Sequence, residues 1–276
     1  MRTLYAVDLD GTFLDSNNKA SDVTVEIIND LIRQGMLITY STARSWHSAH
    51  PPVKNINFNI PCIVYSGAFF VEDKTGKHLR EIYINNKDFS SILNLYKHND
   101  VYPMVYAKID NRERIMWIVG KETPGIKRYL NSRKNDPRLL PISSFDEFLQ
   151  GYVIGITLID KHKKLSPLVS PLNDIEDVYA YLQSNVYVDD EFWLEIYSRQ
   201  ANKHDSIIYL KNQLNADRIV SFGDNVTDLR LFEASDISVA VANSKKEILE
   251  IADIVIGTND QDSVAKFIKY DYKNRC

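Results

Sequence analysis

The sequence predicts an α/β protein in which a parallel-sheet core is interrupted by an inserted α+β module. At both ends of the chain, apolar strands alternate with amphipathic helices, which is typical of a parallel sheet built from βαβ units. Between them, from Tyr83 to Tyr197, strands follow one another less regularly, as in an antiparallel α+β module. We therefore expect a discontinuous core domain over residues 1–82 and 198–276 and an inserted domain over residues 83–197.

Strand, helix and strand open the core. The apolar run Leu4–Val7 predicts a buried strand, and apolar residues at helical spacing predict a helix from Ser21 to Gln34. A second strand, Met36–Tyr40, leads to Thr42. Because the strands of such a unit are parallel, Thr42 is expected at the same sheet edge as Asp8. Further elements expected before the module are a strand at Cys62–Tyr65 and a hairpin at Val71–Leu79, with Pro51 and Pro52 breaking any helix after Arg44.

The module and the last part of the chain are predicted from the same periodicities. The strands expected in the module are Val101–Ala107, Arg114–Val119, Tyr152–Ile159, Val178–Gln183 and Phe192–Tyr197, and the helices are Lys87–His98, Pro124–Ser132 and Ser166–Asn173. After the module we expect a helix from Asn202 to Leu214, strands at Arg218–Phe222, Ile237–Val241 and Asp253–Ile256, and helices around Leu231, from Ser244, and up to Tyr270.

Composition limits the possible functions. The chain has 276 residues, with 25% charged and 44% hydrophobic residues, which are ordinary globular values. A net charge of −4 argues against nucleic-acid binding, and no apolar run reaches the roughly 18 residues of a membrane span. We expect a cytoplasmic protein that binds neither nucleic acid nor membrane; the sequence sets no oligomeric state. Cys62 and Cys276 are expected to be a buried thiol and a terminal thiol rather than a disulfide framework.

Two carboxylates, Asp8 and Asp10, follow the first strand. Residues two apart in an extended segment point to the same side, so both carboxylates can face one site. Two negative charges at such a short distance are poorly tolerated unless one is protonated or a cation lies between them. Two alternatives are a simple Asp-Gly turn and a calcium loop, but the latter needs a Glu where this chain has Lys19.

The other candidate site residues lie at further strand ends. Asp224 and Asp228 follow a predicted strand and are four residues apart, a spacing that can bring both carboxylates to one face, and Lys203 begins a helix nearby. Oxygen ligands of this kind suit Mg²⁺, and the lack of a His or Cys cluster in the sequence speaks against zinc.

In order, these segments resemble the four motifs of the haloacid dehalogenase superfamily of aspartate-nucleophile phosphotransferases. The resemblance covers essentially the whole chain and is to the Cof-type subgroup, which carries a large α+β cap between the second and third motifs on a Rossmann-like core. The matching segments are Asp8-Leu9-Asp10-Gly11-Thr12, Thr42-Ala43-Arg44, Lys203, and Gly223-Asp224 through Asp228. Ala43, Ser66 and Thr227 depart from the family pattern, which commonly has Gly, Asn and Asn at these positions.

The resemblance implies a role for each residue. Asp8 would attack phosphorus, and Asp10 would protonate the leaving group and later activate water. Mg²⁺ would be held by Asp8, the backbone carbonyl of Asp10 and Asp224, with Asp228 holding a metal-bound water or assisting directly. The phosphoryl group would be bound by Thr42, Lys203, Thr227 and the backbone amides of Leu9 and Ala43, and the substrate would be contacted by Arg44 and Gly67.

The leading hypothesis is a Mg²⁺-dependent phosphatase for a small phosphorylated metabolite, in particular a sugar phosphate. A phosphomannomutase-like mutase is the alternative, and it would need a cationic clamp for a second phosphate. Candidates for such a clamp are Arg112, Arg114, Lys127 and Arg128, whose simpler interpretation is a solvated face. A binding protein that retains the fold without catalysis is a third hypothesis.

Overall fold

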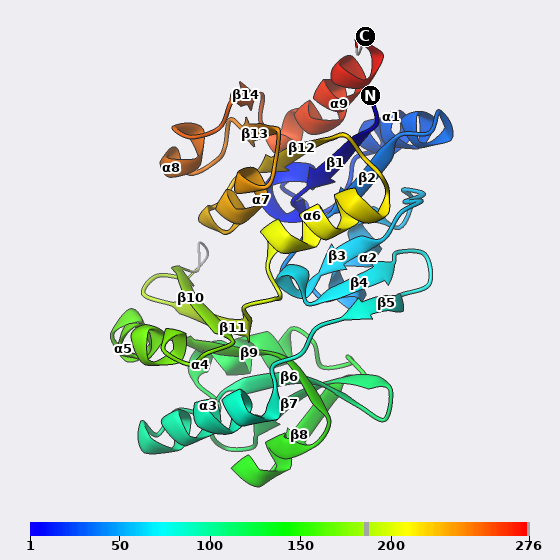
Figure 1. Cartoon of the computed structure of the whole chain (residues 1–276). Helices are drawn as coiled ribbons and strands as arrows, with labels where there is room; N and C mark the ends of the chain where they lie inside the picture. The colour runs from blue at the N-terminus through cyan, green and yellow to red at the C-terminus, as the bar shows by residue number, and fades with distance from the viewer. Residues whose placement is uncertain (185–187, 275–276) are drawn as a thin grey trace. The chain divides into compact units, whose positions relative to one another are not determined.

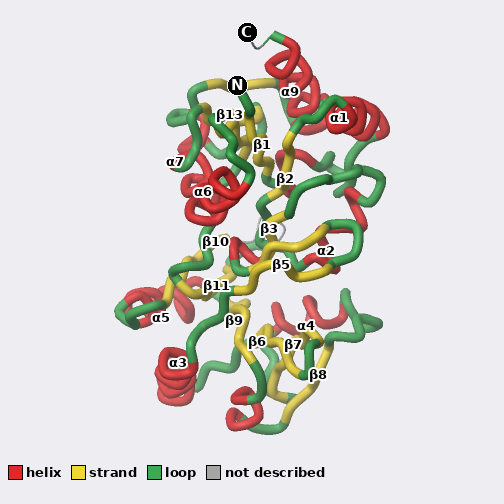
Figure 2. Tube along the Cα trace, turned by 45° about the vertical axis from the view of Figure 1, so that its right-hand side comes forward, coloured by secondary structure: helices red, strands yellow, loops and turns green. Residues whose placement is uncertain are grey.

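The computed structural model describes residues 1–184 and 188–274. The chain forms two compact units, Met1–Glu81 with Ala201–Cys276, and Ile82–Gln200. Figures 1 and 2 show the helices and strands of both units. Within the described residues, none of the helices combines the length and the apolar character needed to cross a bilayer.

The first unit contains a five-stranded sheet in which every neighbouring pair is parallel, in the order β14-β13-β12-β1-β2. The strands are β1 (Thr3–Val7), β2 (Leu37–Tyr40), β12 (Arg218–Gly223), β13 (Ile237–Val241) and β14 (Ile254–Ile256). The helices are α1 (Asp22–Arg33), α2 (Trp46–Val53), α6 (Lys203–Gln213), α7 (Leu229–Glu233), α8 (Lys246–Leu249) and α9 (Ser263–Lys273). The predicted α/β core with a parallel sheet is thereby confirmed.

Helices cover both faces of this sheet. Figure 2 shows α1 and α9 together on one side of it and α6 and α7 on the other. On the latter side, Leu4 and Ala6 of β1 pack in one buried cluster with Ile207 and Leu210 of α6 and Leu231 of α7. Burial of this apolar surface holds α6 against the strands, and so places the first residue of α6 close to the ends of β1 and β12.

A small antiparallel sheet follows β2 in the same unit. It consists of β3 (Cys62–Val64), β4 (Phe69–Glu72) and β5 (Lys77–Glu81), and a parallel bridge between Ser41 and Ile63 joins it to the end of β2. The predicted hairpin is present but begins two residues earlier and ends two residues later. Cys62 is buried, as expected, whereas Cys276 lies outside the described residues.

Contrary to the sequence-based expectation, Pro51 and Pro52 do not break the helix after Arg44 but lie inside α2. Both prolines fall in the last turns, so they remove backbone donors only for carbonyls near the helix start. One of these, the carbonyl of Ser48, accepts instead from the Arg44 guanidinium at 2.9 Å. A side chain thus replaces one of the two backbone bonds that the prolines remove.

The second unit is built on a six-stranded sheet in the order β10-β11-β9-β6-β7-β8, antiparallel except for the β7–β8 pair. Its strands are β6 (Met104–Ile109), β7 (Arg112–Ile118), β8 (Leu139–Ile142), β9 (Tyr152–Asp160), β10 (Val178–Ser184) and β11 (Phe192–Ser198), and its helices are α3 (Asn86–His98), α4 (Pro124–Asn131) and α5 (His162–Asn173). Apolar side chains of α3 and α5 share one buried cluster with the strands, among them Ile92, Leu168 and Ile156.

Three elements of this unit differ from the prediction by more than two residues. β6 begins at Met104 rather than Val101. β8 has no predicted counterpart; it contains Pro141 and pairs only with β7, as expected of an edge strand where a missing N–H is tolerated. α5 begins at His162 rather than Ser166, because the buried stripe of Leu165, Leu168 and Leu172 starts before Pro167.

Candidate active site

Asp8 directly follows strand β1, which lies between β12 and β2 in the parallel sheet. Its backbone N–H donates to the carbonyl of Phe222 at 3.0 Å, so the parallel pairing with β12 continues through this residue. Asp8 is 8% exposed. β1 therefore holds a carboxylate at the edge of the sheet with little freedom to move.

Lys203, the first residue of α6, contacts two buried carboxylates. Its Nζ donates to Oδ1 of Asp8 and to Oδ1 of Asp228, both at 2.7 Å, and the residue is only 5% exposed. Asn202 caps the helix by accepting from the backbone N–H of Asp205 at 2.8 Å. The start of this helix therefore fixes the position of the ammonium group.

Gly67 allows α6 to come this close. A Cβ at this position would lie 2.6 Å from the Asn202 carbonyl oxygen and 2.6 Å from Ser206 Oγ. Gly67 also has φ +111°, a region that favours glycine. Gly67 therefore packs directly against the start of α6, and the substrate contact expected from the sequence stays a prediction.

Asp228 is completely buried, and both of its carboxylate oxygens are engaged. Oδ2 accepts from the backbone N–H groups of Asp224 and Asn225 at 3.0 and 3.1 Å, while Oδ1 accepts from Lys203. Gly223 leaves room for this fold-back, since a Cβ there would lie 2.5 Å from the Asp228 Cβ. The four-residue spacing thus closes a turn and brings the two aspartates together.

Asp224 approaches Asp8 from the end of β12. Its Oδ1 accepts from Thr12 Oγ1 at 2.9 Å, and a Cβ at Gly11 would lie 2.6 Å from its Oδ2. The carbonyl of Gly11 accepts from Asn243 Nδ2 at 2.7 Å. The sequence alone does not indicate these contacts of Thr12 and Asn243. For Thr12, its position directly after the segment Asp8 to Gly11 is a sequence feature that could have suggested a place near the site.

Asp8, Asp224 and Asp228 each offer an oxygen within 4.8 Å of the others. With all three ionised beside the Lys203 ammonium, the cluster carries a formal charge of −2. An oxygen-only donor set with this charge fits a divalent cation such as Mg²⁺. Because Asp228 is already bonded through both oxygens, Asp8 and Asp224 are the residues best able to contact a metal directly.

The pKa values reflect the crowding of these charges. Burial raises the pKa of Asp8 well above its usual range; Lys203 opposes this, and Asp228, Asp224 and Asp10 add to it. Burial and the Asp228 charge raise the pKa of Asp224 to about 6. For Lys203, burial alone would lower the pKa, but the carboxylates of Asp228 and Asp8 more than offset it, so the pKa is raised. A bound cation would relieve the repulsion between the aspartates.

Asp10 lies outside this cluster. Its carboxylate is half-exposed and forms a two-point ion pair with Arg44, whose Nε donates to Oδ2 at 2.8 Å and whose second contact is between Nη2 and Oδ1. The same guanidinium contacts Asn18 Oδ1 and the Ser48 carbonyl. Arg44 therefore orients Asp10, a contact that the sequence does not indicate.

The remaining predicted residues are next to cluster residues in the sequence or lie just after β2. Thr42 is buried directly after β2, and its Oγ1 accepts from the Arg44 backbone N–H at 3.2 Å. Leu9 is buried beside Asp8, while Ala43 is half-buried beside Thr42. Thr227 is half-buried in the turn Val226–Asp228.

The family model of haloacid dehalogenase-like hydrolases matches residues 5–268. The chain belongs to this family. Its relatives include the putative phosphatase YxeH of Bacillus subtilis, 23% identical over 97% of each chain, and the 5-amino-6-(5-phospho-D-ribitylamino)uracil phosphatase YitU of the same organism, 23% identical over 96% of each. The solved structure of BT4131, described as a HAD subclass IIB sugar phosphatase, has the same fold with a TM-score of 0.74, 16% identity and 98% coverage of each chain.

These findings confirm the predicted Cof-type haloacid dehalogenase fold, with a Rossmann-like core and a separate second unit. The predicted enzyme class, a phosphatase of the haloacid dehalogenase type, is confirmed as well, since the family is one of hydrolases and its named relatives are phosphatases.

Proposed function

We propose that this hydrolase cleaves phosphate monoesters of small metabolites through an aspartyl-phosphate on Asp8, with Mg²⁺ bound beside it. The observation that carries the proposal is the arrangement of Asp8: Oδ1 is fixed by Lys203, while Oδ2 accepts no hydrogen bond from the described residues. One oxygen of an oriented, partly buried carboxylate is thus available for attack, and a carboxylate that is ionised needs no further base.

In the proposed reaction, an Asp8 oxygen forms a bond to phosphorus as the bond from phosphorus to the leaving oxygen breaks. Asp10 gives its proton to that oxygen, and the alcohol leaves. Water then attacks the aspartyl-phosphate; Asp10 takes its proton, and the bond from Asp8 to phosphorus breaks to release inorganic phosphate. The exposed position of Asp10, oriented by Arg44, is compatible with this exchange of protons.

Mg²⁺ would be held by Asp8, Asp224 and, as in the family, the backbone carbonyl of Asp10, with Asp228 acting through a water. The ion supplies positive charge that allows an anionic substrate to approach a carboxylate. We further propose that Lys203, Thr42, Thr227 and the amides of Leu9 and Ala43 bind the phosphoryl oxygens.

The substrate class that we propose is a phosphorylated sugar or a related polyol. It is supported by the description of BT4131 as a sugar phosphatase and by the phosphoribityl compound in the name of YitU. We propose that residues 83–197, within the compact unit Ile82–Gln200, act as a cap that recognises the leaving group.

The structure offers little support for a mutase. Among the clamp candidates, Arg128 pairs with Glu191 and Arg114 donates to the Pro137 carbonyl at 2.8 Å, so these two guanidinium groups already have partners. A binding protein without catalysis would have no need of three carboxylates crowded beside one ammonium around Asp8.

The test is phosphate release from a panel of sugar phosphates, nucleotides and cofactor phosphates, with Mg²⁺ and with chelator. We expect Mg²⁺-dependent release from a few related sugars, and its loss in Asp8→Asn. Asp30→Asn, which changes an exposed carboxylate on α1, is the matched control and should retain full activity. Unchanged turnover in Asp8→Asn would refute the nucleophile. Interconversion of hexose 1- and 6-phosphates would favour a mutase, and silence in both assays a binding protein.

A further inference from the structure

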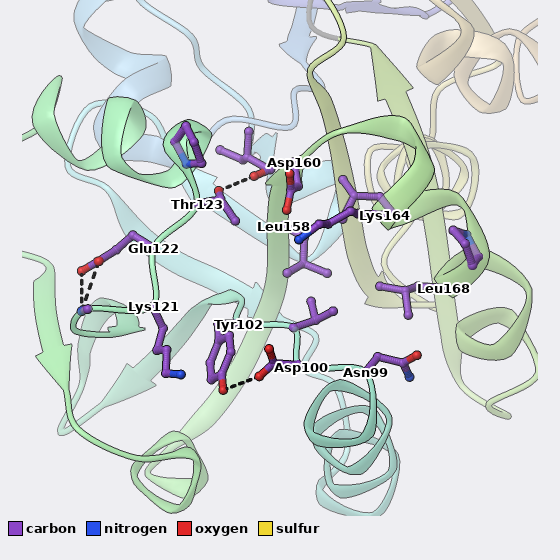
Figure 3. Close-up of a pocket in the computed structure, with 16 residues that line it drawn as sticks. Asn99, Asp100, Tyr102, Lys121, Glu122, Thr123, Leu158, Asp160, Lys164 and Leu168 are labelled. Carbon is purple, nitrogen blue, oxygen red and sulfur yellow. Dashed lines mark hydrogen bonds between the residues drawn. The ribbon is translucent and has the colours of Figure 1, made fainter.

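The second unit contains a pocket of about 580 Å³. All sixteen of its lining residues lie between Asn99 and Leu168, so none belongs to the acidic cluster around Asp8. They come from the segment after α3, the segment before α4, the end of β9 and the first turns of α5 (Figure 3). The volume falls within the range of roughly 300–1,000 Å³ that is typical of small-molecule sites.

The floor of the pocket is apolar. Leu158 of β9 and Leu165 and Leu168 of α5 line it, and each is at most 3% exposed. Tyr102 adds an aromatic wall. An apolar ligand body placed against these side chains would leave water, which favours binding.

The acidic groups of the rim are engaged by the protein itself. Asp100 accepts from the Tyr102 hydroxyl at 2.8 Å, and Asp160 accepts from the Lys161 backbone N–H at 2.8 Å. Glu122 accepts from the Gly120 N–H and from Trp117 Nε1. Burial alone would raise the pKa of Glu122, but these hydrogen bonds to its carboxylate outweigh burial, so the pKa is lowered. Each carboxylate thus has part of its acceptor capacity filled.

Two lysines, Lys164 and Lys121, line the pocket from different walls. Figure 3 shows the Lys164 side chain extending from α5 into the pocket, and its ammonium makes no ion pair or hydrogen bond with any residue that the structure describes. On the opposite wall, Lys121 Nζ lies 4.6 Å from the centre of the Tyr102 ring. An unpaired ammonium and a second cation therefore lie at the walls of a cavity with an apolar floor.

We infer that this pocket binds a small organic anion with an apolar body, of the class of aliphatic or aromatic monocarboxylates. The body packs on the leucine floor and against Tyr102, and the anionic group pairs with Lys164, with Lys121 adding positive charge from the other wall. The inference does not depend on the proposed aspartyl-phosphate chemistry, because no lining residue is among those assigned to the nucleophile, the metal or the phosphoryl group.

The test uses the full-length protein and the fluorescence of 8-anilinonaphthalene-1-sulfonate, which joins an apolar body to an anion. Lys164→Glu should weaken binding of this probe by about tenfold or more, since a charge-assisted contact is lost and a repulsive one introduced. Lys163→Glu is the matched control: it makes the same change of charge one residue away, at a side chain that does not line the pocket. In the native protein, octanoate should displace the probe, whereas 1-octanol and octylamine should do so far less well.

Two results would overturn the inference. One is equal probe affinity in the Lys164→Glu and Lys163→Glu proteins, which would mean that the anion is not held at Lys164. The other is displacement by 1-octanol or octylamine as effective as that by octanoate, which would mean that no anion is recognised. Both readouts are direct binding measurements, so they do not depend on turnover.

Discussion

Asp224→Asn is expected to stabilise the metal-free enzyme while removing its stabilisation by Mg²⁺. Asp224 lies beside two other buried carboxylates, and burial together with the Asp228 charge raises its pKa from 3.8 to about 6. Between these two values the folded protein binds the proton more tightly than the unfolded chain does. Stability therefore falls as the pH rises from about 4 to about 6, and the full penalty is present at pH 7.

The size of the effect follows from the shift. A difference of about two pKa units corresponds to roughly 3 kcal/mol, which is an upper limit because Asp224 is only partly buried and solvent screens its charge. Asparagine is neutral at every pH, and its Oδ1 can still accept from Thr12. We expect the variant to gain about 1–3 kcal/mol at pH 7, or on the order of 3–10 °C in melting temperature.

The assay is thermal unfolding of the native and variant proteins in chelator at pH 5 and pH 7, and again with Mg²⁺. The gain should be complete at pH 7 and roughly half as large at pH 5, because pH 5 lies about midway between the unfolded and folded pKa values of Asp224. Mg²⁺ should raise the melting temperature of the native protein and have little effect on the variant. A variant that melts at or below the native temperature in chelator at pH 7, or that keeps the full Mg²⁺ effect, would refute the reasoning.

Two further substitutions test how α6 supports the site. Lys203→Met leaves two buried carboxylates without their ammonium and should lower the free energy of unfolding, measured in urea, by about 3–5 kcal/mol. Lys211→Met, on the same helix but in a more exposed ion pair, should lower it by less than about 1 kcal/mol. Equal losses in the two variants would contradict a buried ion-pair network. Gly67→Ala should lower both the melting temperature and kcat by more than Gly35→Ala does. Both glycines have positive φ, but only at Gly67 would a Cβ collide with the Asn202 backbone. Similar losses in the two variants would show that the close approach of α6 is unimportant.

Most elements of the fold follow from local patterns in the sequence. The apolar run of β1 and the helical spacing of apolar residues in α1 are strong signals because each is buried in a regular way. The failures occur where a proline is tolerated for a tertiary reason. β8 keeps Pro141 because it is an edge strand, and α2 keeps its prolines because Arg44 bonds to the Ser48 carbonyl.

The type of fold, and the set of residues that gather at one edge of the sheet, follow from the sequence alone. Parallel strands end at the same edge, so the residues that follow β1, β2 and β12 must meet there, whatever their separation along the chain. The nature of these side chains, carboxylates with one lysine, then indicates a site for a divalent cation and a phosphate.

Which atoms of that group bond to one another becomes known only from the packed structure. Lys203 lies 195 positions from Asp8, yet its Nζ contacts both Asp8 and Asp228. Asp10 turns to Arg44, although its spacing from Asp8 is compatible with a shared site. The physical reason is that a side chain's orientation depends on the donors, charges and free volume that packing brings around it, and spacing along the chain specifies none of these.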